Sequence, residues 1–322
     1  MRKLHTKTIK YLCIFLSAVC VTSLIGCREK AIAEGEFDSI TYEITAAENV
    51  GNARSNEPEV LEPVAAGEVI YGNDTVSIDV SNASEGYIII TYTGDSPKVK
   101  VQLTGPDQVT YTYNLLTENA VIPITSGNGV YSATVFENIS GSQYSTLYSE
   151  DMNLTVTNTF GPYLYPNQYV NFNKDSAVVP KAKELAAGAT SDMEVVTAIY
   201  SYVVNNVTYD KEKLESAEKT YLPDPDEVLA TKRGFCFDYS ALMAAMLRSQ
   251  RIPARMEIGY AGDVYHAWLS VYIDEIGWVN GMIEFNGTDW ALMDPTFAAN
   301  MSNSKLKSFI GDGSNYTTKY VY

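Results

Sequence analysis

A cysteine, a histidine and an aspartate in the last third of the chain are spaced as a nucleophile, a base and an orienting group could be. Cys236 stands in the run KRGFCFDYS, His266 follows 30 residues later in VYHAWLSV, and Asp294 follows after another 28 in ALMDPT. A thiol beside an imidazole that a carboxylate orients is the arrangement that activates cysteine for attack on a carbonyl carbon. The spacing therefore predicts a cysteine-nucleophile site for acyl transfer.

The residues around each candidate indicate how it is positioned. Cys236 comes just before ALMAAMLR, a run of strong helix formers, and Gly234 is suited to the entry turn, so Cys236 is expected in the first turn of a helix. Unpaired N–H groups and the helix dipole there favour the thiolate and can hold an oxyanion. His266 and Asp294 lie in alternating segments typical of strands, which could be neighbours.

The N-terminal residues predict export. Residues 1–26 contain four basic and no acidic residues and an apolar stretch, and they lead into Leu24-Ile25-Gly26-Cys27. This resembles a bacterial lipoprotein signal peptide, which implies cleavage before Cys27 and a diacylglycerol anchor on its sulfur, at the outer face of the cell membrane. An uncleaved membrane span is the alternative, but the apolar run is short and interrupted by serine and threonine.

The numbers of cysteines and histidines limit which disulfides and metal sites the chain can form. Two of the four cysteines and one of the two histidines lie within residues 1–26, and Cys27 would carry lipid. Cys236 and His266 then remain as a single free thiol and a single imidazole, so no intramolecular disulfide can form. They cannot build a tetrahedral metal site, and the sequence contains no phosphate-binding glycine loop or calcium loop. No metal or cofactor is expected.

The net charge of the chain indicates which classes of binding partner are excluded. The chain has 39 acidic and 23 basic residues and a formal net charge of −16, which argues against nucleic acid as a partner. Residues 27–66 are rich in Ala, Glu, Asn and Pro and poor in apolar side chains, which predicts a flexible acidic tether.

Residues 67–162 show short segments of period-two alternation separated by glycine-rich turns, the pattern of an all-β domain. We expect an Ig-like β-sandwich. The predicted strands are Thr75–Val80, Tyr87–Thr93, Lys98–Leu103, Thr110–Leu115, Ala120–Ile124, Gly129–Phe136 and Met152–Thr157. This half has many tyrosines but no cysteine, histidine or clustered motif, so its expected role is that of a spacer or specificity module.

Residues 165–322 read as an α+β domain, with helical spacing at 179–187 and 193–204. Its motifs Gly-x-Cys-x-Asp-Tyr-Ser from Gly234, His-Ala-Trp from His266 and Asp-Pro-Thr from Asp294 stand in the order found in the transglutaminase-like superfamily, which the segment resembles. The resemblance implies a papain-like core, with Cys236 on a central helix packed against an antiparallel sheet that carries His266 and Asp294.

One feature departs from the animal crosslinking enzymes of that superfamily, which have a tryptophan upstream of the nucleophile as an oxyanion donor. All three tryptophans here follow Cys236, so Tyr221 or Tyr209 is the candidate replacement. Asp294 has a rival role as a turn cap, and Asp238 is expected to act as a carboxylate in the first turn of the helix.

The function expected from these features is that of an exported, membrane-anchored enzyme that acts on amide bonds through an acyl-thioester. Its partners would be the lipid bilayer, through Cys27, and a protein or peptide substrate such as a cell-wall peptide. Hydrolysis by a peptidase or amidase is favoured, because water is always available as the acceptor. A transglutaminase forming Gln–Lys isopeptide links and a non-catalytic surface binding module are the alternatives.

Overall fold

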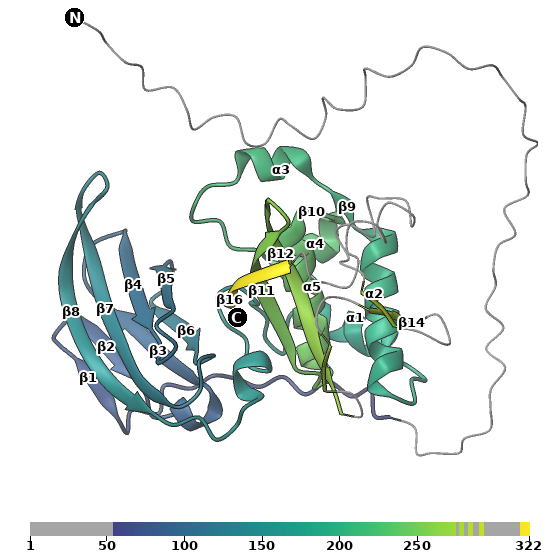
Figure 1. The fold of residues 1–322 in the computed structure, drawn as a ribbon, viewed down its shortest axis with the longest axis horizontal. Coiled ribbons are helices and arrows are strands. Elements are labelled where there is room, and N and C mark those ends of the chain that lie inside the picture. Colours follow the sequence, from purple (N-terminus) through teal and green to yellow (C-terminus); the bar gives the residue numbers. More distant parts are fainter. Residues whose placement is uncertain (1–53, 275–276, 280–282, 286–289, 293–315) are drawn as a thin grey trace, which may run out of the picture. The chain divides into compact units, whose positions relative to one another are not determined.

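A computed structural model describes residues 54–274, 277–279, 283–285, 290–292 and 316–322 (Figure 1). All of these residues belong to one unit that starts at Val50. The predicted signal peptide, the lipidation site Cys27 and the third candidate, Asp294, lie outside the described residues.

The first half of the described chain forms two antiparallel sheets of four strands each. One sheet has the order β1-β2-β3-β6, with β1 at Ile70–Gly72, β2 at Val76–Asp79, β3 at Tyr87–Tyr92 and β6 at Asn119–Pro123. The other has the order β5-β4-β7-β8, with β4 at Val99–Thr104, β5 at Thr110–Leu115, β7 at Gly129–Ser140 and β8 at Gln143–Leu154. Short 3-10 turns lie at Ala83–Glu85 and Gly161–Tyr163. The sheet-rich N-terminal region expected from the alternation is therefore present, and its Ig-like classification stays a prediction.

The hairpin of β7 and β8 extends well beyond the segments that the sequence predicted. The alternation indicated strands at Gly129–Phe136 and Met152–Thr157, whereas the two strands pair from Gly129↔Leu154 up to Ser140↔Gln143. Most of the additional residues are polar, and all are exposed or half-buried, so no regular apolar period marks them.

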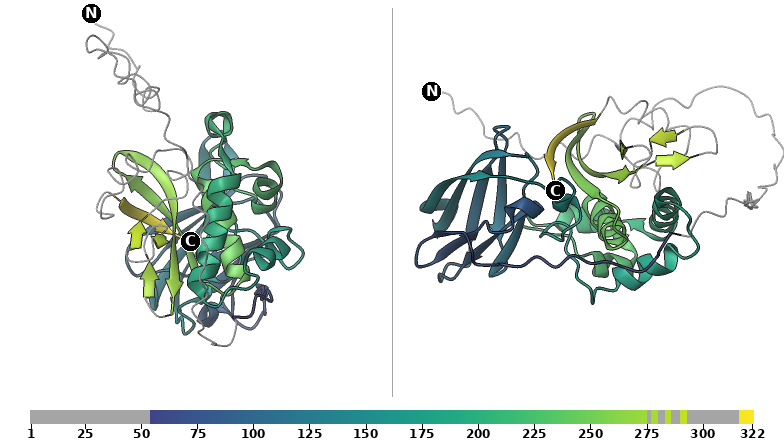
Figure 2. Two further views of the ribbon diagram at one scale, coloured as in Figure 1. Left: turned by 90° about the vertical axis from the view of Figure 1, so that its right-hand side faces the viewer. Right: turned by 90° about the horizontal axis from the view of Figure 1, so that it is seen from below.

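Helices, a third four-stranded sheet and short strands make up the rest of the described chain. The helices are α1 at Val178–Leu185, α2 at Asp192–Asn206, α3 at Lys211–Ser216, α4 at Pro225–Thr231 and α5 at Cys236–Ser249. The sheet has the order β13-β12-β11-β16, from Gly277–Val279, Val264–Ile273, Ala254–Ala261 and Tyr316–Val321. The short strands are β9 at Thr208–Tyr209, β10 at Arg233–Gly234, β14 at Ile283–Phe285 and β15 at Trp290–Leu292. The helices lie on one side of the β13-β12-β11-β16 sheet (Figure 2).

Helix α5 is the buried centre of this half. Every residue from Asp238 to Ser249 is buried, and the helix contacts α1, α2, α4, β11 and β12. A helix that is apolar nearly all round can be stable only when other elements cover it. The run ALMAAML therefore folds as part of a core helix. Cys236, the first residue of α5, lies at the edge of the core and is partly exposed. No helix in the described part of the chain is long and apolar enough to cross a membrane.

The last turn of α5 contains a buried arginine that joins distant segments. Arg248 is 1% exposed, and its guanidinium donates to the carbonyl oxygens of Ala254, Tyr165 and Tyr322 at distances of 2.7 to 3.1 Å. Burial lowers the pKa of Arg248 to about 9. These bonds tie the end of α5 to β11, to the segment that follows the first domain, and to the end of the chain.

The stretch predicted as a flexible tether differs from the structure over its last part. Residues 54–66 run along the helical half as an extended segment, here called the strap. Arg54 forms an ion pair with Asp192 at the start of α2, and the amide of Glu59 donates to the carbonyl of Ser249 at 2.9 Å. Acidic composition predicted disorder, but fixed hydrogen-bond and charge partners hold this segment in place.

Candidate active site

The free thiol and the imidazole lie on the wall of one cavity. This cavity has a volume of about 360 Å³, and both Cys236 and His266 line it. Cys236 is partly exposed, whereas His266 is buried with 5% of its surface exposed. A thiol that substrate can reach, beside a largely desolvated imidazole, is the minimum that acyl transfer by cysteine requires. The structure thus brings together two members of the predicted triad, and Asp294 lies outside the described residues.

Cys236 occupies the position at α5 that the sequence predicted. Phe235 is the N-cap in an extended conformation, and Cys236 is the first helical residue. The first N–H groups of a helix have no intrahelical partner, so they point toward whatever lies at the mouth of the helix. That position favours a thiolate and provides donors for an oxyanion.

Gly234 has a steric reason to be glycine. A Cβ at this position would lie 2.5 Å from the Cβ of Asp238, a separation that real side chains do not show. The close approach lets the Asp238 carboxylate accept the amide N–H of Phe235 at 2.9 Å. Gly234 and Asp238 together thus fix the turn that presents Cys236.

His266 is set by the pairing of β12 with β11. It lies opposite Gly259, and its ring stacks near that of Trp268 with centroids 6.3 Å apart. A Cβ on Gly259 would lie 2.0 Å from the carbonyl oxygen of Thr317 in β16, at a point where the β11–β16 register shifts. Gly259 therefore lets three strands pack closely at the level of the imidazole.

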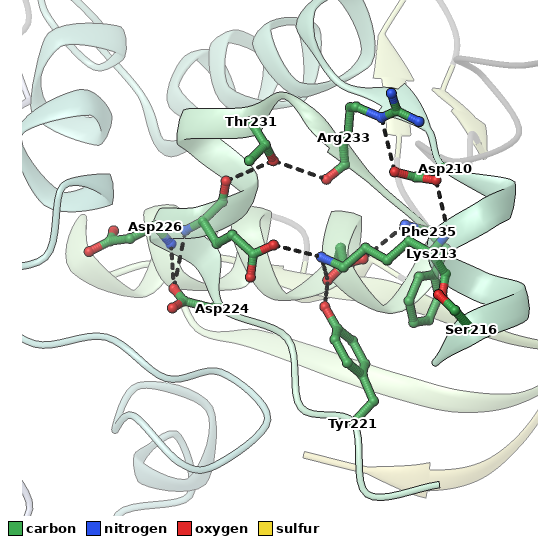
Figure 3. A network of polar contacts seen from close by, with 11 residues as sticks. Asp210, Lys213, Ser216, Tyr221, Asp224, Asp226, Thr231, Arg233 and Phe235 are labelled. Atoms are coloured by element: carbon green, nitrogen blue, oxygen red, sulfur yellow. Dashed lines mark hydrogen bonds and ion pairs between the residues drawn. The ribbon is translucent and has the colours of Figure 1, made fainter. Parts of the chain in front are cut away.

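A polar network at the start of α5 includes Lys213, Tyr221 and Phe235, which Figure 3 labels, and all three contact Asp238. The Asp238 side chain is fully buried and accepts from the hydroxyl of Tyr221, the amide of Phe235 and the ammonium of Lys213, the last at 3.4 Å. Burial raises the pKa of Asp238, and the three donors oppose that rise. The pKa of Tyr221 is raised by burial and by its bond to Asp238. The network joins the segment from Lys213 to Tyr221 to the helix that carries the nucleophile.

This network bears on the two tyrosines proposed as oxyanion donors. The ring of Tyr221 lines the cavity, but its hydroxyl donates its single proton to Asp238. Tyr209 lies in β9, which pairs in parallel with β10, and it is not among the described residues that line the cavity. In this arrangement the donors left for an oxyanion are the backbone N–H groups at the start of α5.

The first domain contributes to the cavity, which the sequence had not indicated. Thr112 and Asn114 of the edge strand β5 line it. Tyr111 and Tyr113 on the same strand contact aromatic rings near the end of the chain, including Tyr322 at 5.6 and 6.1 Å between centroids. The only signal in the sequence was tyrosine alternating with small polar residues in β5, which reads equally well as a half-buried strand.

Among the described residues no group of three or more histidine, cysteine or acidic side chains could hold a metal ion.

The profile of the transglutaminase-like superfamily matches residues 180–281, which include α5 and β12. Among curated relatives, "Uncharacterized protein YebA" of Bacillus subtilis is 28% identical over 36% of this chain and 19% of its own length. UPF0252 protein MJ1282 of Methanocaldococcus jannaschii is 23% identical over 67% of each chain. Kyphoscoliosis peptidase of Mus musculus is 23% identical over 39% of this chain and 19% of its own length. The chain thus spans about a fifth of two of these relatives.

Solved structures with similarity include a protein from Cytophaga hutchinsonii, provisionally named a cysteine protease, with 14% identity and a TM-score of 0.34 over 79% of this chain and 81% of that one. Red sea bream transglutaminase has 12% identity and a TM-score of 0.24 over 65% of this chain and 48% of its own. Residues 180–281 thus match the transglutaminase-like superfamily.

Proposed function

We propose that this protein is an exported, membrane-anchored cysteine-nucleophile enzyme that acts on amide bonds, with Cys236 as nucleophile and His266 as base. The observation that supports it is that the thiol at the start of α5 and the imidazole on β12 line the same cavity. Asp294 is proposed to orient the imidazole, on the strength of its motif.

The first half of the reaction forms an acyl-enzyme. His266 takes the thiol proton of Cys236, and the sulfur forms a bond to the amide carbonyl carbon. The carbonyl oxygen becomes an oxyanion, which the first-turn N–H groups of α5 stabilise. When the C–N bond breaks, the departing amine takes the proton from His266. The product of this half is a thioester on Cys236.

The acceptor in the second half decides the reaction class. Water attacks the thioester carbon after giving a proton to His266, the C–S bond breaks, and the sulfur regains a proton. We place this hydrolysis first because water needs no binding site of its own. If a lysine amine is the acceptor, the product is an isopeptide link and the enzyme is a transglutaminase. If the protein is a surface binding module, it catalyses neither half of the reaction.

Export and anchoring are proposed from the sequence of residues 1–27. Cleavage before Cys27 and diacylation of its sulfur would hold the enzyme at the outer face of the bacterial membrane, near cell-wall peptides and surface proteins. Mass spectrometry of the purified protein would show a chain starting at residue 27 with the added lipid mass. A chain that retains residue 26 contradicts the anchor.

A test of the reaction incubates the chain from residue 27 with a peptide library containing glutamine and lysine. The matched control is Cys236→Ala, and mass spectrometry follows cleavage and crosslinking together. Cleavage that depends on Cys236 is the expected result. Lysine adducts or crosslinks in its place indicate a transglutaminase, and no product with either acceptor contradicts an enzymatic role.

A further inference from the structure

The described residues that line the cavity are basic rather than acidic, in contrast to the chain as a whole. Acidic residues outnumber basic ones by 39 to 23, yet the described residues that line the cavity include no aspartate or glutamate. They include one lysine, Lys219. In a protein with this net charge, a catalytic cavity with an ammonium group and no carboxylate on its described walls is suited to a negatively charged substrate group.

Lys219 differs from the neighbouring lysine that also lies close to the site. The ammonium of Lys213 is 3.4 Å from Asp238 and 3.5 Å from Glu227, so its charge is already compensated. Lys219 is exposed, and among the described residues no carboxylate forms an ion pair with it. An ammonium without an internal counter-ion attracts an external anion.

Neutral hydrogen-bonding groups complete the same cavity. Thr112 and Asn114 of β5 and Thr220 beside Lys219 line it. Glu218, the residue before Lys219, accepts from the Thr220 hydroxyl at 3.5 Å; it is exposed and does not line the cavity. Hydroxyl and amide groups can donate to a carboxylate, and none of them repels it.

From the cavity, its missing carboxylates and this lysine we infer that the enzyme selects peptides with an acidic side chain beside the amide bond it attacks. Lys219 is the specificity-determining cation, and Asn114 and Thr112 on the opposite domain donate to the same carboxylate. The inference rests on the proposed function, since it names the substrate class of the Cys236 site.

Two covalent probes that differ only in charge test the inference without requiring turnover. N-chloroacetyl-glutamate amide and N-chloroacetyl-glutamine amide both alkylate Cys236: the sulfur displaces chloride, an S–C bond replaces the C–Cl bond, and the thiol proton leaves. The measured quantity is the ratio of the two second-order rate constants in the chain from residue 27. We expect the acidic probe to react about fivefold faster.

Variants at position 219 assign the selectivity. Lys219→Met should bring the ratio close to one, Lys219→Glu should invert it, and Lys219→Arg should preserve it. Lys211→Met makes the same charge change on an exposed lysine of the same segment that does not line the cavity, and it should leave the ratio unchanged. A ratio that Lys219→Met and Lys219→Glu do not alter overturns the inference.

The same experiment separates this inference from the proposed function. Cys236 is partly exposed, so both probes label it at a measurable rate even if the thiol is not activated. The absolute rate, compared with that of His266→Ala, reports on activation and so on the proposed function. The ratio of the rates reports on Lys219 alone.

Discussion

At the scale of single residues, the position of the nucleophile depends on a buried carboxylate. Asp238 is fully buried in the first turn of α5 and accepts from Phe235, Tyr221 and Lys213. A buried carboxylate without donors would be costly, so these bonds hold the surrounding segment as well as the charge. Tyr221 is therefore interpreted as a positioning residue whose ring forms part of the cavity wall.

Replacing Tyr221 with phenylalanine tests that interpretation. Because the lost bond stabilises the ionised form of Asp238, its removal should lower the free energy of unfolding by about 1–2 kcal/mol above the pKa of Asp238. The loss should shrink at acidic pH, where Asp238 is protonated in both proteins. Urea unfolding at pH 4 and pH 7 measures this, with Tyr202→Phe on α2 as the control.

The kinetics of the same variant distinguish the rival role. If the Tyr221 hydroxyl donates to the oxyanion instead, Tyr221→Phe should lower kcat by about 100- to 1000-fold with little change in stability. We expect a change in kcat of less than about tenfold, since the backbone N–H groups of α5 remain.

At the scale of elements, the strap stabilises the side of the helical half away from the cavity. Its contacts reach α1, α2 and the end of α5: Asn56 donates to the carbonyl of Lys183 at 3.1 Å, and Glu57 pairs with the Lys183 ammonium at 2.7 Å. Gln250 donates to the carbonyl of Asn56 at 3.2 Å. None of these residues lines the cavity, so the strap bears on stability rather than on chemistry.

Two truncations measure the contribution of the strap. A chain that starts at residue 54 retains all of these contacts and should unfold at the same urea concentration as the chain from residue 27. A chain that starts at residue 67 should lose about 2–4 kcal/mol, from several hydrogen bonds and one half-buried ion pair. Equal midpoints for the two truncated chains would show that residues 54–66 are only a tether.

At the scale of the whole described chain, the first domain helps to build the site. Strand β5 presents Thr112 and Asn114 to the cavity, and the hydroxyl of Tyr111 on the same strand accepts the amide of Val321 at 3.3 Å. Aromatic contacts of Tyr113 with Tyr169 and Tyr322 add to this junction. The sheet-rich region therefore lines the cavity, and we propose that it takes part in substrate binding.

Asn114→Ala tests that role. Loss of a donor on the cavity wall, away from the thiol, should raise KM for an acidic peptide several-fold while kcat and thermal stability stay unchanged. Gln143→Ala, at an exposed position of β8 that does not line the cavity, is the control and should change neither constant. A fall in kcat with constant KM would argue that β5 acts on the chemistry instead.

The sequence by itself determined the likeness of residues 180–281 to the transglutaminase-like superfamily, the sheet-rich first half, and the start of α5 at the cysteine. These features follow from local causes. Alternation marks half-buried strands, and a run of strong helix formers marks a helix. Gly234 permits a turn in which a Cβ would clash with Asp238. The ordered motifs also predicted that Cys236 and His266 belong to one site, and both line the same cavity.

The tertiary structure decided which residues share the cavity. Lys219, Thr112 and Asn114 carry no motif, and they meet Cys236 only because β5 and the segment after α3 converge on the start of α5. The same cause explains the strap, whose acidic composition predicted a free tether, and Tyr221, whose hydroxyl donates a hydrogen bond to Asp238. Composition and period describe each segment against solvent, whereas these outcomes depend on partners more than ten residues away.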